Sequence, residues 1–164
     1  MAGAPDMDEL YDASYRRLVV QLYAVCGNLP DAEDAVQEAF VTALRKRRQF
    51  GAVANPEAWL RTTALNKLKT GWRHAEVVRR YQGRVPGPQL DVDVGPERVA
   101  IVSALAQVDA DQRLVTVLHY LADLGTAEIA AELGIPEGTV KSRLSRARAR
   151  LAPLIDDREE PRHV

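Results

Sequence analysis

Residues 134–151 read GIPEGTVKSRLSRARARL, and they combine a helical apolar spacing with a dense positive charge. At 100° per residue, one narrow sector of this helix holds Val140, Leu144, Ala147 and Leu151. Such a stripe is typical of a helix that packs one side on a core. The opposite side carries Gly138, Ser142, Ser145, Arg146 and Ala149, and the margins carry Thr139, Lys141, Arg143, Arg148 and Arg150.

The preceding residues 124–136, LGTAEIAAELGIP, predict a short helix with Ile129, Ala130 and Leu133 inward, followed by a turn at Gly134. Two helices joined in this way form a helix-turn-helix, whose second helix can enter the major groove of DNA. The marginal cations would then meet phosphates, while Ser142, Ser145 and Arg146 would face base edges. A basic surface helix of an ordinary bundle is the alternative interpretation.

The composition sets the limits of the fold and of the function. The 164 residues carry a formal net charge of −1, are 46% hydrophobic and only 5% aromatic, and hold one cysteine, Cys26. This size allows one domain or two small ones, and the Leu, Ala and Val content favours helices. No apolar run is long enough to cross a membrane, no signal peptide is evident, and a lone cysteine favours a reducing cytoplasm.

The sequence contains no clear set of catalytic residues. His74, His119 and His163 are scattered, and neither a nucleophile–base pair nor a phosphate-binding loop stands out. We therefore predict that the protein is not an enzyme and that it has no catalytic residue, metal site, cofactor or small-molecule substrate.

Helical periodicity predicts an all-α fold with helices over residues 6–27, 31–48, 56–74, 97–107, 109–122, 126–133 and 137–151. Asp31 is the expected cap of the second helix, which would bury Leu44, and the fifth helix would bury Leu121. Residues 50–59 read as a loop, and residues 82–96, with three prolines and three glycines, read as part of a flexible linker. The predicted domains are 6–75 and 97–152, joined by a linker at 76–96 and followed by a frayed tail at 153–164.

Two polar helix faces in the first half are candidate binding surfaces. Asp34, Gln37, Glu38 and Val41 share one face of the second helix, which suits docking to a basic protein surface. A solvated face is the alternative. On the third helix, cations, hydroxyls, an amide and an indole gather on one side, as in proteins that stack unpaired bases and hold phosphates. These residues are Trp59, Thr62, Thr63, Asn66, Lys69 and Arg73, and packing of Trp59 against the first helix is its alternative role.

Three segments together carry a family resemblance. AEDAVQEAF at residues 32–40, AWL, LN and WR along residues 58–73, and AEIAAELGIPEGTVKSRLSRARARL at residues 127–151 occur in this order. The chain resembles an extracytoplasmic-function (group 4) bacterial RNA polymerase sigma factor over residues 10–151. It departs from the family pattern at Leu65, Thr70 and Gly71.

The resemblance implies a role for each surface. Asp34, Gln37, Glu38 and Val41 would bind the β′ clamp helices of the polymerase core. The −10 element would meet Trp59, Thr62, Asn66, Lys69 and Arg73, with a flipped base held beside Asn66. The −35 element would meet Thr139, Lys141, Ser142, Arg143, Ser145 and Arg146.

The same resemblance implies that the second domain docks on the β flap and that the linker threads through the polymerase. It also implies a cytoplasmic, nucleoid-associated location and admits an anti-sigma factor as a partner. Two other functions remain open on the residues alone: a stand-alone helix-turn-helix regulator, which would need a dimer, and a helical adaptor without a DNA role. Tight binding of duplex DNA by the protein alone would favour the regulator.

Overall fold

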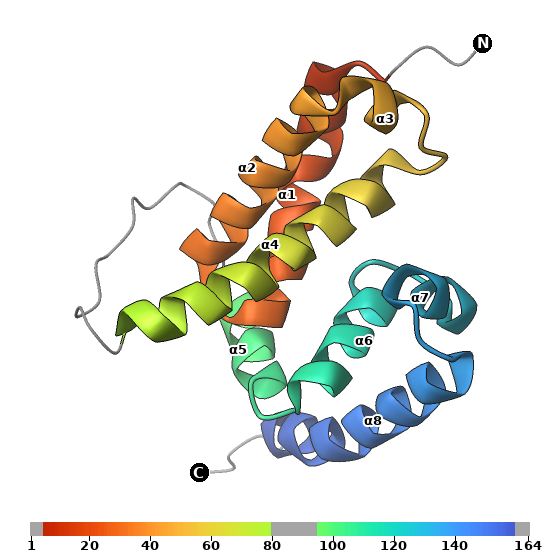
Figure 1. The fold of residues 1–164 in the computed structure, drawn as a ribbon. Coiled ribbons are helices and arrows are strands. Elements are labelled where there is room, and N and C mark those ends of the chain that lie inside the picture. Colours follow the sequence, from red (N-terminus) through yellow and green to blue (C-terminus); the bar gives the residue numbers. More distant parts are fainter. Residues whose placement is uncertain (1–4, 80–94, 160–164) are drawn as a thin grey trace. The chain divides into compact units, whose positions relative to one another are not determined.

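The computed structural model describes residues 5–79 and 95–159, and for residues 72–79 and 155–159 only the backbone is considered. The chain divides into two compact units, Met1–Asp93 and Val94–Val164. The first unit holds α1 (Met7–Cys26), α2 (Leu29–Arg45), α3 (Arg47–Gly51) and α4 (Pro56–Arg79); the second holds α5 (Pro96–Leu105), α6 (Ala110–Tyr120), α7 (Thr126–Leu133) and α8 (Glu137–Glu159) (Figure 1). Every regular element in these described ranges is an α-helix, which confirms the all-α prediction.

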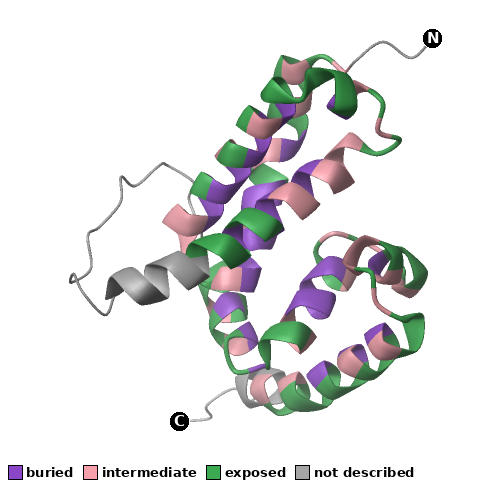
Figure 2. Cartoon of the chain, viewed as in Figure 1, coloured by how far each residue is buried: buried purple, intermediate pink, exposed green. Residues whose placement is uncertain are grey.

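Three long helices, α1, α2 and α4, pack side by side and form the core of the first unit (Figure 1). Small residues on α2 let the helix axes approach closely, because alanine adds little bulk between two backbones. Figure 2 shows the buried positions along the facing sides of the helices. The buried residues include Leu18, Val19 and Leu22 of α1, Ala32, Val36, Ala39 and Ala43 of α2, and Leu60, Ala64, Leu65 and Leu68 of α4.

The start of α2 differs from the prediction. The side chain of Asn28 caps the helix by accepting a hydrogen bond from the Asp31 amide at 3.1 Å, so Asp31 lies in the first turn. Pro30 is tolerated in this first turn because the first helical N–H groups have no partner within the helix. The α1 helix ends at Gly27, whose φ of 71° is a left-handed conformation that favours glycine.

The end of α2 also differs. Helix α2 stops at Arg45, and residues predicted to continue it form α3 instead, so residues 50 and 51 are helical rather than looped. The turn buries Phe50, which is 2% exposed, against the edge of Trp59 at 5.0 Å between ring centroids. Leu44, predicted to be buried, is 52% exposed.

The second unit packs α6, α7 and α8 around buried residues from each helix. Leu114, Val117 and Leu118 of α6, Ile129 of α7, and Val140, Leu144 and Ala147 of α8 are buried. Leu121, predicted for this core, is exposed. Arg113 fixes the turn before α6, because its guanidinium donates to the carbonyls of Leu105 and Val108 at 2.8 and 2.9 Å.

Two helices are longer than predicted. Helix α4 continues past residue 74 to Arg79, and α8 continues through Pro153 to Glu159, so part of the predicted tail is helical. Most of the predicted linker, residues 80–94, lies outside the described residues, and its positions 76–79 belong to α4.

Candidate protein and nucleic-acid interfaces

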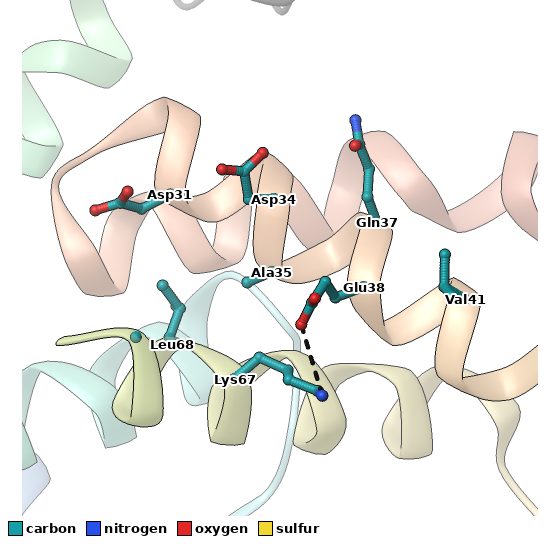
Figure 3. A pocket seen from close by; sticks show the side chains of 9 residues that line it. Asp31, Asp34, Ala35, Gln37, Glu38, Val41, Lys67 and Leu68 are labelled. Atoms are coloured by element: carbon teal, nitrogen blue, oxygen red, sulfur yellow. Dashed lines mark ion pairs between the residues drawn. The ribbon is translucent and has the colours of Figure 1, made fainter. Parts of the chain in front are cut away.

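The four predicted residues on α2 lie together at the surface of the first unit (Figure 3). Asp34, Glu38 and Val41 are exposed, and Gln37 is half-buried and donates a hydrogen bond to the Tyr15 hydroxyl at 3.3 Å. They border a groove of about 510 Å³ whose lining is Asp31, Asp34, Ala35, Gln37, Glu38, Val41, Lys67, Leu68 and Gly71. The groove is a candidate docking site for a protein segment that carries positive charge.

Sequence reasoning missed two charged residues that line this groove, Asp31 and Lys67. Asp31 lies one turn before Asp34 on the same face, a spacing that could have been noticed. Lys67 comes from α4, and its ammonium lies 3.5 Å from the Glu38 carboxylate (Figure 3). Both of these side chains are largely exposed, so the pair contributes little to stability.

The charges around Asp34 are mutually repulsive. Partial burial raises the pKa of the Asp34 carboxyl, and the nearby carboxylates of Asp31 and Glu38 raise this pKa further. Repulsion of this kind disfavours the ionised form and is relieved by a positive partner. The surface is therefore better suited to a cationic protein segment than to another acidic one.

The predicted residues of α4 are divided between the surface and the interior. Asn66 and Lys69 are exposed, whereas Trp59 and Thr62 are half-buried, and Arg73 lies outside the residues whose side chains are described. The indole of Trp59 meets Phe50 of α3 edge-on, which is a structural contact. Arg61, also on α4, is only 4% exposed and therefore lies in the interior rather than on this surface.

Helix α4 is attached to α1 by a two-pronged ion pair. The Arg17 guanidinium donates from Nε and Nη2 to the two carboxylate oxygens of Glu57 at 2.7 and 2.8 Å. The paired geometry fixes direction as well as distance. It holds the first turn of α4, which precedes Trp59 and the exposed polar face.

Helices α7 and α8 form the predicted helix-turn-helix. Gly134 ends α7 with a φ of 66°, a conformation that glycine adopts without strain. Across the turn, the Thr126 hydroxyl donates to Glu137 at 2.8 Å. This hydrogen bond is the main reason that the pKa of Glu137 is lowered, with the Lys141 ammonium adding to the effect. The carboxylate therefore ties the first turn of α8 to α7.

The outer face of α8 is small and polar, as predicted. Ser142, Ser145 and Arg146 are exposed, and Thr139 is half-buried. Three of the five cations at residues 141–150 of this helix have a partner in the same unit: Lys141 lies 3.5 Å from Glu137, Arg143 lies 3.7 Å from Asp111, and Arg148 donates to the Tyr120 hydroxyl at 2.7 Å. Arg146 and Arg150 have no such partner within the described residues.

An apolar groove of about 520 Å³ lies on the second unit, and sequence reasoning did not find it. Its lining is Ile101, Ala104, Leu105, Thr116, Val117, Tyr120, Leu121, Arg148, Leu151 and Ala152. Ile101, Tyr120 and Leu121 are 50%, 57% and 38% exposed. Apolar side chains left this open at a groove are typical of a site for a partner helix.

Two kinds of feature are absent from the parts of the chain described here. Within residues 5–79 and 95–159, no group of three or more His, Cys, Asp or Glu side chains could hold a metal ion. No helix in these ranges combines the length and the apolar character needed to cross a bilayer.

Comparison with known proteins adds independent evidence. The family model of Sigma-70 region 2 matches residues 10–84, and that of Sigma-70, region 4 matches residues 98–151. The chain is 37% identical over 150 residues to the ECF RNA polymerase sigma factor SigL of Mycobacterium tuberculosis, covering 87% of this chain and 85% of that protein.

Solved structures agree with the sequence matches. The sigma factor RpoE of Bartonella quintana, in complex with the anti-sigma factor NepR, is 27% identical with a TM-score of 0.73 over 91% of this chain and 96% of that one. CnrH in complex with the cytosolic domain of CnrY is 25% identical with a TM-score of 0.61 over 92% and 88% of the two chains. With the two matched regions in this order and the helix-turn-helix in the second, the chain belongs to the extracytoplasmic-function sigma factors of RNA polymerase, which act in transcription initiation.

Proposed function

We propose that this sigma factor directs core polymerase to promoters by using the two units for different contacts. The first unit binds the β′ clamp helices through Asp34, Gln37, Glu38 and Val41, and it binds the −10 element through α4. The second unit reads the −35 element with α8. The exposed row of Ser142, Ser145 and Arg146 on α8 carries this proposal, because it offers hydrogen-bonding groups to base edges with nothing of its own unit covering them.

The −10 contact depends on the exposed part of α4. Asn66 and Lys69 are exposed and can contact a DNA strand. The half-buried Trp59 and Thr62 precede them on the predicted polar face of α4. Unstacking one base costs a few kcal/mol, and contacts to the flipped base return part of that cost without nucleotide hydrolysis. Promoter melting thus needs no catalytic group on this chain, and RNA synthesis belongs to the polymerase core.

The apolar groove of the second unit supports the predicted docking on the β flap. Its exposed Ile101, Tyr120 and Leu121 would be covered by an apolar helix of the polymerase. Region 76–96 would pass through the polymerase between the two units. An anti-sigma factor is a further proposed partner, because two of the similar structures are complexes with such inhibitors or with a cytosolic partner domain.

The pairing of cations on α8 disfavours the alternative of a stand-alone regulator. A protein that binds duplex DNA unaided relies on free Lys and Arg side chains to replace counterions on phosphates. Here three of the five cations at residues 141–150 first have to leave partners in their own unit. We expect the isolated protein to bind duplex DNA only weakly at the salt concentration of the cytoplasm, where the nucleoid lies.

In vitro transcription tests the proposal. Core polymerase is mixed with the protein and genomic template, and the RNA start sites are mapped. Defined starts that require the protein are the expected result. A matched reaction with the Asp34→Arg variant separates a requirement for core binding from carry-over of another sigma factor. Failure of the protein to join the core, or transcripts without defined starts, would contradict the proposal.

A further inference from the structure

Arg148 occupies an unusual place among the cations of α8. It follows Lys141 by seven residues, so both lie on the same margin of the helix, about 10 Å apart along the axis. Its Nε nevertheless donates to the Tyr120 hydroxyl at 2.7 Å, across to α6. The guanidinium carbon lies 5.8 Å from the ring centroid, near the outer limit of about 6 Å for a cation–π contact, so the hydrogen bond is the main link.

Tyr120 packs against His119 but remains largely exposed to solvent. The ring of His119 meets it edge-on at 4.8 Å, and Nδ1 of His119 lies 2.8 Å from the Leu124 carbonyl oxygen, to which it donates. Tyr120 is nevertheless 57% exposed, and both Tyr120 and Arg148 line the apolar groove. Any helix that fills the groove contacts both of them.

We propose that Tyr120 is a positioning residue that keeps Arg148 away from DNA phosphate until the apolar groove is filled. The inference rests on the proposed function, in which the groove takes an apolar polymerase helix. Such a helix packs on the Tyr120 ring and on the aliphatic part of Arg148, and it needs to displace only one hydrogen bond. The freed guanidinium then joins Lys141 on the same margin, where a charge-assisted bond to phosphate is stronger than the bond to a neutral hydroxyl.

The variant Tyr120→Phe tests the withholding step in the free protein. It keeps the ring against His119 and removes only the hydroxyl that accepts from Arg148. Binding to duplex DNA of mixed sequence is measured by fluorescence anisotropy over a salt series, because a phosphate contact needs no particular sequence. We expect tighter binding and a slope of log K against log salt that is steeper by about 0.9, the value for one added phosphate contact. The affinity advantage of the variant then shrinks about 3.5-fold between 50 and 200 mM salt.

Arg148→Gln supplies the matched control. In the wild-type background it should leave the affinity and the salt slope of the free protein unchanged, because Arg148 is engaged by Tyr120. In the Tyr120→Phe background it should return the slope to the wild-type value. An unchanged slope in Tyr120→Phe, or an equal loss from Arg148→Gln in both backgrounds, overturns the proposal. Thermal melts of each variant confirm that the second unit is folded.

The role of groove filling is measured in the holoenzyme. Arg148→Gln should weaken promoter binding there about 3.5-fold more at 50 mM than at 200 mM salt, although it is silent in the free protein. If Arg148→Gln has no effect in either the free protein or the holoenzyme, filling the groove does not release Arg148. That result overturns the proposed coupling between groove filling and phosphate contact. If core polymerase does not bind the protein at all, the proposed function fails, whereas the free-protein salt slope still decides whether Tyr120 withholds Arg148.

Discussion

The two units each present a charged helix face, but the charges are handled in opposite ways. On α2 the carboxylates of Asp31, Asp34 and Glu38 lie near one another, and their repulsion raises the pKa of Asp34. On α8 three of the five cations at residues 141–150 are paired inside their own unit. Asp34 would gain by meeting a positive protein, whereas Lys141, Arg143 and Arg148 would have to exchange their own contacts before gaining from DNA. A charged face therefore does not by itself indicate how strongly a protein binds.

The grooves differ in the same sense. The groove beside α2 is bordered by carboxylates and Lys67, and the groove of the second unit is almost wholly apolar. Electrostatic contacts mainly set association rate and partner choice, while apolar burial supplies affinity. The comparison predicts that salt weakens the contact of the first unit with the polymerase more than the contact of the second.

The largest expected effect comes from Leu144→Ala, with Leu44→Ala as its counterpart in the first unit. Leu144 is 2% exposed, so its truncation should lower the free energy of unfolding of the second unit by about 2–5 kcal/mol. Leu44 is 52% exposed, and its truncation should change stability by about 0.5 kcal/mol or less. Urea denaturation measures both changes. An equal loss of unfolding free energy from the two variants would show that Leu44 packs in the core.

Arg146→Ala should have the next largest effect, on DNA recognition. Because Arg146 is exposed on the outer face of α8, we expect a loss of about 1–3 kcal/mol in discrimination between promoter variants at −35. Arg150→Ala on the margin is the control, and it should weaken binding alike for all sequences. Holoenzyme binding to a panel of −35 variants measures both, and a uniform loss from Arg146→Ala would assign that residue to phosphate only.

Asp34→Arg should weaken binding to core polymerase about tenfold, or ~1.4 kcal/mol, because it places a cation where we propose that a cationic segment of the polymerase docks. Asp12→Arg reverses another exposed acid, on α1 and outside the groove, and should leave core affinity unchanged. Fluorescence titration with labelled protein at two salt concentrations measures the difference. Equal affinities for the two variants would remove α2 from the polymerase interface.

Gly71→Ala should give the smallest effect, and in the stabilising direction. A Cβ at Gly71 meets no atom within 4 Å, and glycine inside a helix costs about 0.5–1 kcal/mol relative to alanine. We expect that gain in the unfolding free energy of the first unit, read by thermal or urea denaturation. A loss of stability would show that this part of α4 needs the flexibility of glycine.

Local pattern was sufficient for seven of the eight described helices, though not for all their ends, and for the faces of α8. A helical period of apolar residues identified the stripe of Val140, Leu144 and Ala147 and placed Ser142 and Arg146 opposite it, and burial confirms both. The family resemblance, confirmed by the comparisons, came from short motifs of the same kind. The assignments of individual residues to polymerase or DNA remain predictions.

Packing between distant segments decided the rest. Phe50 is buried against Trp59 of α4 and Leu44 of α2 is exposed, and no spacing within α2 could indicate either. Likewise, the partners of Lys67, Arg143 and Arg148 lie on other helices, at Glu38, Asp111 and Tyr120. The sequence alone determined which side chains are available on each helix, because helical periodicity is a local property. Only the tertiary structure decided which of them are already engaged, because that depends on which helices pack together.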